Sequence, residues 1–152
     1  GRTKTVSGTG EVRLEEIGLL NEKGEQIEVV GVGQRVTLRA RLRVHRPVDT
    51  LVFGYLIKDR LGQSAFGTNT FHLQQPLKNL VAGELITYSF DFSMALGPGN
   101  YSVSTAPVST SDHLTNNFEW RDLALVFNVV NLNQAYFEGM SWLPPTVSVD
   151  RT

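Results

Sequence analysis

The strongest constraint on the fold is a ten-residue stretch, "RVTLRARLRV" at residues 35–44, in which apolar and polar side chains alternate strictly. Successive side chains of a β-strand point to opposite faces of its sheet. The stretch is therefore expected to be a strand with one face in a core and the other in water. The apolar face comprises Val36, Leu38, Ala40, Leu42 and Val44.

Further segments have the same period. It recurs in "LITYSFDF" at residues 85–92 and in "NYSVST" at residues 100–105. Two other segments, "LVFGYLI" and "LALVFNVV", are apolar on both faces, which predicts cover on both sides. A helical period is almost absent, apart from one expected turn near residues 132–138. We expect about eight strands, at residues 11–20, 26–30, 35–45, 50–58, 63–67, 84–93, 99–106 and 122–130.

Turn residues separate these segments, as in "NEKG" at residues 21–24 and "DRLG" at residues 59–62, where Gly62 suits a positive φ. Short strands with frequent turns are typical of an antiparallel, immunoglobulin-like β-sandwich. In "LGPGNYSV", Tyr101 matches the tyrosine corner that precedes a late sandwich strand. The chain of 152 residues suits a single domain over residues 1–152.

Composition excludes several classes of function. The chain has no cysteine, which rules out disulfides, thiolate zinc sites and cysteine nucleophiles, and which fits a reducing compartment. The net charge of −1 provides no general attraction to nucleic acid or to an anionic membrane. No apolar run reaches the length of about 18 residues that a membrane helix needs, so no direct membrane insertion is expected.

The usual catalytic motifs are also missing, since the sequence has no GxSxG, HExxH or phosphate-binding loop. His45, His72 and His113 lie on separate elements and do not have the spacing of a metal site. The adjacent Ser111 and Asp112 precede His113, but a catalytic triad needs side chains that converge from separate backbone positions. We therefore expect no enzyme activity, no cofactor and no metal.

A row of arginines on the polar face of residues 35–44 is one candidate site. Arg39, Arg41 and Arg43 could bind an anionic group of a ligand through forked hydrogen bonds. The alternative is a solvated sheet face whose arginines pair with acids on neighbouring strands, such as Asp91 or Glu15.

Two loops combine aromatic and amide side chains, as carbohydrate sites do: "GTNTFHLQQ" at residues 67–75 and "STSDHLTNNFEW" at residues 109–120. The alternative is that Trp120 and Phe118 plug one end of the sandwich while the amides cap turns. Asn69 and Thr70 have a similar alternative, because they can satisfy backbone groups where a strand ends. The candidate carbohydrate-binding residues in these loops are Asn69, Thr70, His72, Asn116 and Trp120.

The chain continues beyond the last expected strand, and this tail at residues 131–152 is rich in apolar side chains. Such a group needs a surface to cover it. Pro144 and Pro145 favour an extended path, after which "TVSV" can pair with the sheet edge of a second copy. The alternative is a tail folded over its own sandwich. The apolar residues of the tail are Tyr136, Phe137, Met140, Trp142 and Leu143.

The hairpin "FGYLIKDRLGQSAFGTNT" at residues 53–70 resembles a motif in the C-terminal domain of Wzt-type proteins, the nucleotide-binding subunits of ABC transporters that export O-antigen polysaccharide. Its matching elements are Gly54, Asp59-Arg60, Gly62 and the "GTNT" ending. The "GNY" at residues 99–101 and Trp120 followed by "ALVF" fit as well. The resemblance extends over roughly residues 11–130 and is most specific in the hairpin.

The resemblance implies a non-catalytic carbohydrate-binding domain that recognises the terminus of lipid-linked O-antigen polysaccharide. It implies an ATPase domain upstream, outside this chain, through which the protein would meet a membrane transporter subunit. It also implies a homodimer at the cytoplasmic side of the inner membrane. It transfers no sugar contact residue by residue. The alternative function is a structural sandwich that joins two subunits and binds no sugar.

Overall fold

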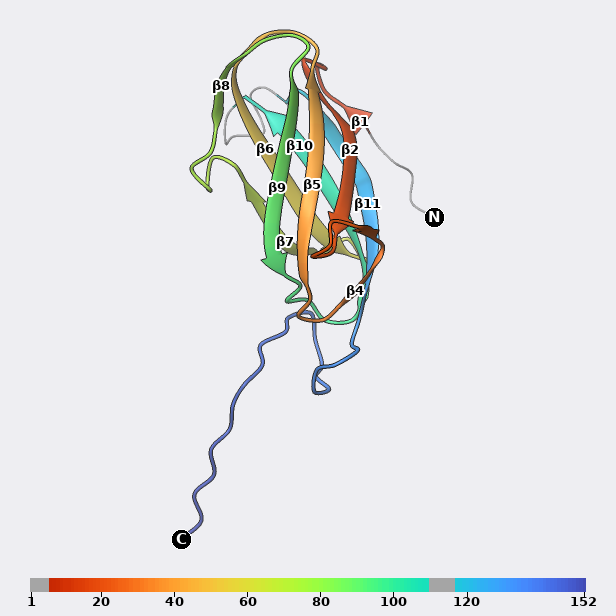
Figure 1. Ribbon diagram of the computed structural model, residues 1–152, viewed down its shortest axis with the longest axis vertical. Coiled ribbons are helices and arrows are strands. Elements are labelled where there is room, and N and C mark those ends of the chain that lie inside the picture. Colours follow the sequence, from red (N-terminus) through yellow and green to blue (C-terminus); the bar gives the residue numbers. More distant parts are fainter. Residues whose placement is uncertain (1–5, 110–116) are drawn as a thin grey trace.

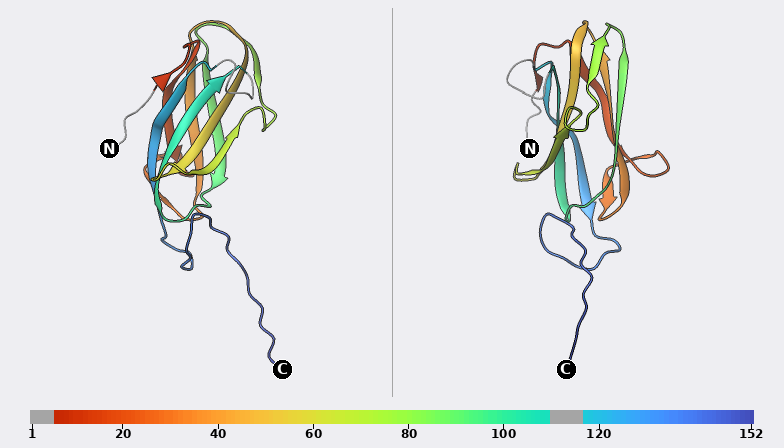
Figure 2. Two further views of the ribbon diagram at one scale, coloured as in Figure 1. Left: turned by 180° about the vertical axis from the view of Figure 1, so that it is seen from behind. Right: turned by 90° about the vertical axis from the view of Figure 1, so that its left-hand side faces the viewer.

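The computed structural model describes residues 6–109 and 117–152, and the described chain forms two β-sheets packed face to face (Figures 1 and 2). One sheet, which we call sheet B, has the order β3 (Gln26–Ile27), β2 (Val12–Leu20), β5 (Arg35–Val44) and β9 (Leu85–Ser93). All its neighbouring strands are antiparallel. The predicted antiparallel β-sandwich is thus confirmed.

The second sheet, sheet A, has the order β1 (Val6–Ser7), β11 (Trp120–Val130), β10 (Gly99–Val108), β6 (Val48–Asp59) and β7 (Ser64–Asn69). Two short strands join it at the sides. β4 (Val29–Gly31) pairs in parallel with β11, and β8 (Leu77–Leu80) pairs with β6. Sheet A lies in front when the molecule is seen from behind (Figure 2, left).

Most predicted strands are confirmed, with ends that lie within two residues of the expected positions. The segment expected as one strand at residues 26–30 is instead two strands, because β3 belongs to sheet B and β4 to sheet A. The strands β1 and β8 were not predicted; they span two and four residues, too few for a period to be recognised. The prediction of a helical turn near residues 132–138 is wrong. This stretch contains no helix, and the side chain of the preceding Asn131 accepts a hydrogen bond from the Gln134 backbone.

The core lies between the inner faces of the two sheets. The alternating residues of β5 enter it as expected, and Phe53 from β6 stacks on Tyr88 from β9 with ring centroids 5.0 Å apart. Phe118, just before β11, closes the core near Leu14 and Val48. No helix long and apolar enough to cross a membrane occurs in residues 6–109 or 117–152.

The tail divides into two parts. Residues 131–142 fold against the end of the sandwich, where the Trp142 backbone donates a 2.9 Å hydrogen bond to the Ala95 carbonyl. Phe137, Met140 and Trp142 pack against the core. From Leu143 onward the chain is extended, leaves the sandwich and is exposed (Figure 1). The alternative of a tail folded over its own sandwich therefore describes residues 131–142. Pairing of the extended part with a second copy stays a prediction.

Candidate functional site

The outer face of sheet A carries two hollows. Alternation along β10 places Ser104 and Ala106 in one of them and Asn100 and Ser102 in the other. We name them after one residue each, the Trp120 hollow and the Val126 hollow. Their volumes are about 310 Å³ and about 790 Å³, respectively.

The Trp120 hollow has a floor of small residues, which include Gly54, Gly67 and Ala106. A β-carbon on Gly67 would lie 2.8 Å from Cδ1 of Leu56, so the end of the Leu56 side chain would have to move to make room for a larger residue. Trp120, Leu56 and the exposed His72 form the walls. Tyr55 also borders the hollow. Burial raises the pKa of its phenol, so this group stays protonated at neutral pH.

Trp120 stands on the outer face of the sheet. Its indole is half-buried and packs against Val52, Ala106 and Val108. Only Phe118, which is buried, occupies the position of an end plug. The sequence suggested that Trp120 and Phe118 together plug one end of the sandwich, but only Phe118 does so. Part of the Trp120 ring is accessible from the hollow.

The "GTNT" ending of the hairpin has a largely structural role. The Thr70 hydroxyl accepts a 2.9 Å hydrogen bond from the Phe53 backbone, and this side chain is buried. The Asn69 side chain accepts a 2.8 Å hydrogen bond from the His72 backbone, which fixes the turn that carries His72. Asn69 and His72 also line the Trp120 hollow, whereas Thr70 does not.

A bulge in β11 builds a polar group beside the Trp120 hollow. The register between β10 and β11 shifts between Val103 and Thr105, and Leu123 in the bulge has a φ of 49°. The bulge turns Asp122 toward Ser104, whose hydroxyl donates a 2.6 Å hydrogen bond to Oδ1 of the carboxylate. Lys58 completes the group: its Nζ lies 3.7 Å from Oδ1 of Asp122 and 5.9 Å from the centroid of the Trp120 ring.

Sequence reasoning missed Lys58, Ser104 and Asp122. Alternation along β6 was the available signal for Lys58, because it shares a face with Gly54 and Leu56. No sequence signal marked Asp122, since its direction depends on the bulge.

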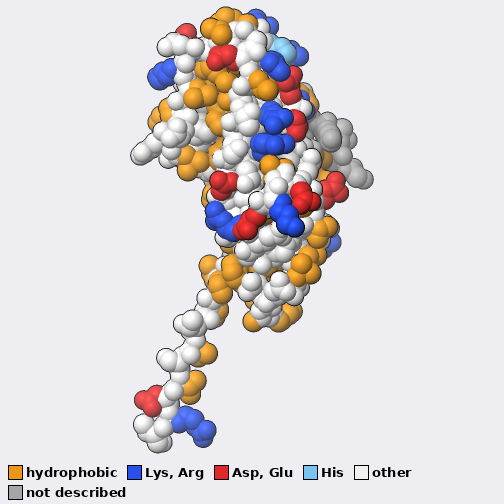
Figure 3. All heavy atoms as spheres, viewed as in Figure 1, with side chains coloured by type: hydrophobic (Ala, Val, Ile, Leu, Met, Phe, Trp, Pro, Cys, Tyr) orange, Lys and Arg blue, Asp and Glu red, His pale blue; other side chains and the backbone are white. Residues whose placement is uncertain are grey.

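The arginines lie on the outer face of sheet B, the face on which Figure 3 shows Lys and Arg side chains next to Asp and Glu side chains. The Trp120 hollow lies on the outer face of the other sheet. Arg39 and Arg41 both pair with Glu16, at 3.2 and 3.4 Å, and Arg43 pairs with Glu15 at 3.2 Å. Of the two acids suggested as partners, Glu15 is one; Asp91 accepts a hydrogen bond from Thr37 instead. Anion binding by these arginines stays a prediction, but each would have to exchange a carboxylate partner.

Asn116 lies outside the described residues, as do Ser111, Asp112 and His113. Within the described chain, no group of three or more His, Cys, Asp or Glu side chains could hold a metal ion.

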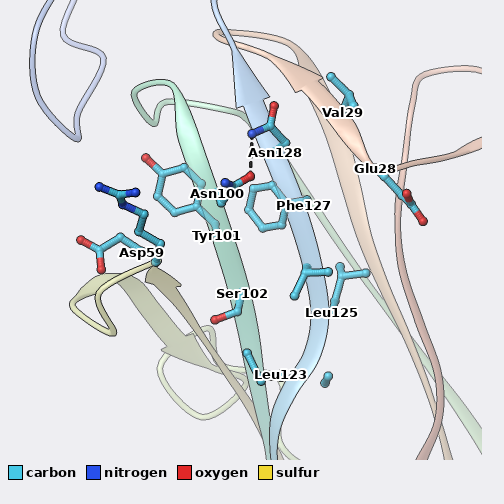
Figure 4. A pocket seen from close by; sticks show the side chains of 13 residues that line it. Glu28, Val29, Asp59, Asn100, Tyr101, Ser102, Leu123, Leu125, Phe127 and Asn128 are labelled. Carbon is cyan, nitrogen blue, oxygen red and sulfur yellow. Dashed lines mark hydrogen bonds between the residues drawn. The ribbon is translucent and has the colours of Figure 1, made fainter. Parts of the chain in front are cut away.

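The Val126 hollow is wide and mainly apolar (Figure 4). Val126 and Val29 on its surface are 61% and 58% exposed. At one end the Asn128 amide donates a 2.7 Å hydrogen bond to the Asn100 side chain (Figure 4). The expectation that the second face of "LALVFNVV" is covered is thus not met among residues 6–109 and 117–152. The same face of "LVFGYLI" is covered in part, because Trp120 packs on Val52.

Fold and surface together define an immunoglobulin-like β-sandwich domain with a recessed outer sheet face. The family model of the Wzt C-terminal domain matches residues 3–143, so the chain belongs to that family. The crystal structure of the C-terminal domain of Wzt superposes with a TM-score of 0.84 at 17% identity, over 96% of this chain and 88% of that one.

A more distant fold likeness exists to a Niemann-Pick type C2 protein from Japanese carpenter ant. Its TM-score is 0.51 at 8% identity, over 85% of this chain and all of that one (100%). No curated protein sequence matches the chain. At these identities the solved structures bear on the fold alone, and they agree with the predicted sandwich.

Proposed function

We propose that this chain is a non-catalytic carbohydrate-binding domain that recognises the end of an O-antigen polysaccharide during export by an ABC transporter. The observation that carries the proposal is the Trp120 hollow, in which an indole wall stands over a floor of glycine and alanine. Membership of the Wzt C-terminal domain family supports the transporter context.

The chemistry of the Trp120 hollow suits a sugar. One face of a pyranose ring is lined with C–H groups and packs on an aromatic ring, while its hydroxyls need polar partners at the rim. Trp120 supplies the aromatic ring, and Lys58, Ser104 and His72 supply polar groups around it. The small floor residues allow a ring to approach the sheet backbone. A volume of about 310 Å³ is at the lower end of ligand sites, which favours a chain end over a long internal segment.

The transporter context supplies the remaining parts of the proposal. The ATPase domain would lie upstream of this chain and would connect it to the membrane transporter subunit. The domain would act on the cytoplasmic side of the inner membrane, where the lipid-linked polysaccharide is selected. It would need neither a cofactor nor a metal for recognition.

The extended end of the tail favours a homodimer as the working form. Leu143, Val147 and Val149 are 81%, 85% and 77% exposed, and they extend away from their own sandwich. An apolar segment of this kind gains free energy by covering apolar surface, and the Val126 hollow offers such a surface on a second copy. This observation also supports the second candidate function, a dimerisation sandwich that binds no sugar.

A titration distinguishes the two functions. The domain is titrated with the surface polysaccharide of its own source organism, either intact or trimmed at its chain end, and heat of binding is recorded. Export recognition predicts binding to the intact polysaccharide and weaker binding to the trimmed one. A dimer that binds neither form would leave only the structural function.

A further inference from the structure

We infer that the Trp120 hollow selects an uncharged sugar residue and that Lys58 serves there as a hydrogen-bond donor to a hydroxyl group, with its charge balanced by Asp122. The inference rests on the proposed function and specifies the class of residue that this site reads.

The lining of the hollow carries almost no charge. Within the described chain it contains no Lys, Arg, Asp or Glu side chain. The lining is formed mainly by Gly, Ala, Leu, Trp and neutral polar residues, with His72 at the exposed rim. A carboxylate or phosphate moved from water into such a hollow loses hydration without gaining a counter-ion, and this loss is costly.

Lys58 is a cation beside the hollow, and it pairs with Asp122. Its Nζ lies 3.7 Å from Oδ1 of Asp122, which is close enough for an ion pair but too long for a hydrogen bond. The carboxylate is held in place by the Ser104 hydroxyl and by the Leu123 backbone, at 2.6 and 3.0 Å. The positive charge of Lys58 is therefore already balanced by a fixed partner.

The same geometry leaves Lys58 with donor capacity. An ammonium group has three N–H donors. Among the described residues, the Lys58 ammonium forms an ion pair with Asp122 and a cation–π contact with Trp120, whose ring centroid is 5.9 Å away. Neither contact is a hydrogen bond. A donor next to an aromatic wall is placed to bind a hydroxyl at the edge of a sugar ring that packs on that wall. The balanced pair thus suits a neutral ligand with hydroxyl groups.

The arginines of sheet B cannot bind a charged group of a sugar residue that lies in the Trp120 hollow. Arg39, Arg41 and Arg43 lie on the other sheet and are each paired with a glutamate. An anionic group held there would be on the opposite side of the sandwich from Trp120. One sugar residue cannot contact both faces.

The experiment uses the full chain and two forms of its own organism's surface polysaccharide. One form is native; in the other, carboxyl groups are reduced and phosphates are removed. We expect equal affinity for both forms, and an affinity that stays constant as sodium chloride rises, because a neutral contact is not screened. An affinity that falls steeply with salt, together with loss of binding to the neutralised form, would overturn the inference.

Variants of Lys58 test its part as a donor. We expect Lys58→Met, which keeps most of the side-chain length but has no donor, to weaken binding about tenfold. Lys58→Gln keeps N–H donors without charge and should bind more tightly than the Met variant. If both variants bind as the wild type does, or if Gln is no better than Met, then Lys58 is not the proposed donor.

A matched control removes a positive charge from the other face. Arg41→Ala should leave affinity unchanged; a loss there would place the ligand on the arginine face and refute both the inference and the proposed site. If the wild-type chain binds neither form of the polysaccharide at any salt concentration, the proposed function itself fails. That result differs from failure of the inference alone, in which the wild type binds but discriminates by charge.

Discussion

The Tyr101 hydroxyl donates a 2.7 Å hydrogen bond to the backbone carbonyl of Gly97, four residues earlier in the chain. This bond is the tyrosine corner that the sequence pattern predicted, and it pins the loop between β9 and β10. The same residue, Gly97, also donates a 2.7 Å backbone hydrogen bond to Met140 in the tail. The corner therefore ties together the entry to β10 and the docked part of the tail.

Replacing Tyr101 with Phe should lower the free energy of unfolding by about 1–3 kcal/mol, because the Gly97 carbonyl loses its buried partner while the ring stays packed. The measurement is urea unfolding followed by fluorescence. Tyr136→Phe is the control, because it removes the same hydroxyl group at an exposed position. A Tyr101→Phe protein as stable as the control would show that the hydrogen bond contributes nothing.

Replacing Gly97 with Ala should disturb the docked tail. A β-carbon there would lie 2.0 Å from the Gly139 carbonyl oxygen, a contact that only a backbone shift can relieve. We expect a loss of about 1–3 kcal/mol of stability and faster hydrogen exchange at residues 131–142. Gly62→Ala is the control for the tail: nothing lies within 4 Å of its position, and the strain from its φ of 83° is confined to the hairpin turn. Equal exchange of the tail in both variants would contradict the contact.

Replacing Trp120 with Ala should abolish polysaccharide binding, because it removes the aromatic wall of the hollow. The protein should still unfold cooperatively, since the indole is only half-buried and lies on the outer sheet face rather than in the main core. Calorimetric titration and thermal unfolding are measured on the same sample. A folded Trp120→Ala protein with wild-type affinity would remove this hollow from the site.

Deleting residues 144–152 should convert the proposed dimer to a stable monomer, because it removes the exposed extended segment and leaves Phe137, Met140 and Trp142 on the core. Sedimentation at micromolar concentration measures the association state. Truncation after Val130 is a harsher variant that also exposes core surface, so it should lower thermal stability as well. A dimer that survives the shorter deletion would show that the extended segment is not what joins the subunits.

Glu11 should give the fold an acid-sensitive contribution to stability. Partial burial alone would raise the pKa of its carboxyl, but hydrogen bonds from Thr9 and Arg46 outweigh this effect and the pKa lies below its usual value. A lowered pKa stabilises the fold above the unfolded-state pKa, and this stabilisation is lost as pH falls through the folded-state pKa. Urea unfolding of wild type and Glu11→Gln at neutral and acidic pH should show a difference that shrinks in acid. A constant difference would contradict the assignment.

Much of the fold follows from local pattern. The alternation at residues 35–44 predicted both the strand β5 and the buried positions Val36 and Leu38, since the period of a strand is a property of its own backbone. The tyrosine corner and the turn at Gly62, whose φ is 83°, were also recognisable, because each involves only residues that are close together in the sequence. The hairpin at residues 53–70 was specific enough to indicate the family.

The site depended on relationships that local pattern does not contain. Asn69, His72 and Trp120 were named from composition, yet only the pairing of β6 with β7 and β10, and of β10 with β11, brings them to one hollow. The arginine stripe was equally visible in the sequence, but the register of β2 against β5 pairs its members with Glu15 and Glu16 of the same sheet, away from the Trp120 hollow.

The amino-acid order by itself determined where strands form and which of their faces are apolar, because both depend on neighbours along the chain. The tertiary structure decided which surfaces stay open. Lys58 meets Asp122 only because two strands distant in sequence lie on either side of β10 and because a bulge at Leu123 turns the carboxylate toward that strand. Register and bulges follow from packing between the sheets, so the charge balance beside Trp120 exists only in the folded chain.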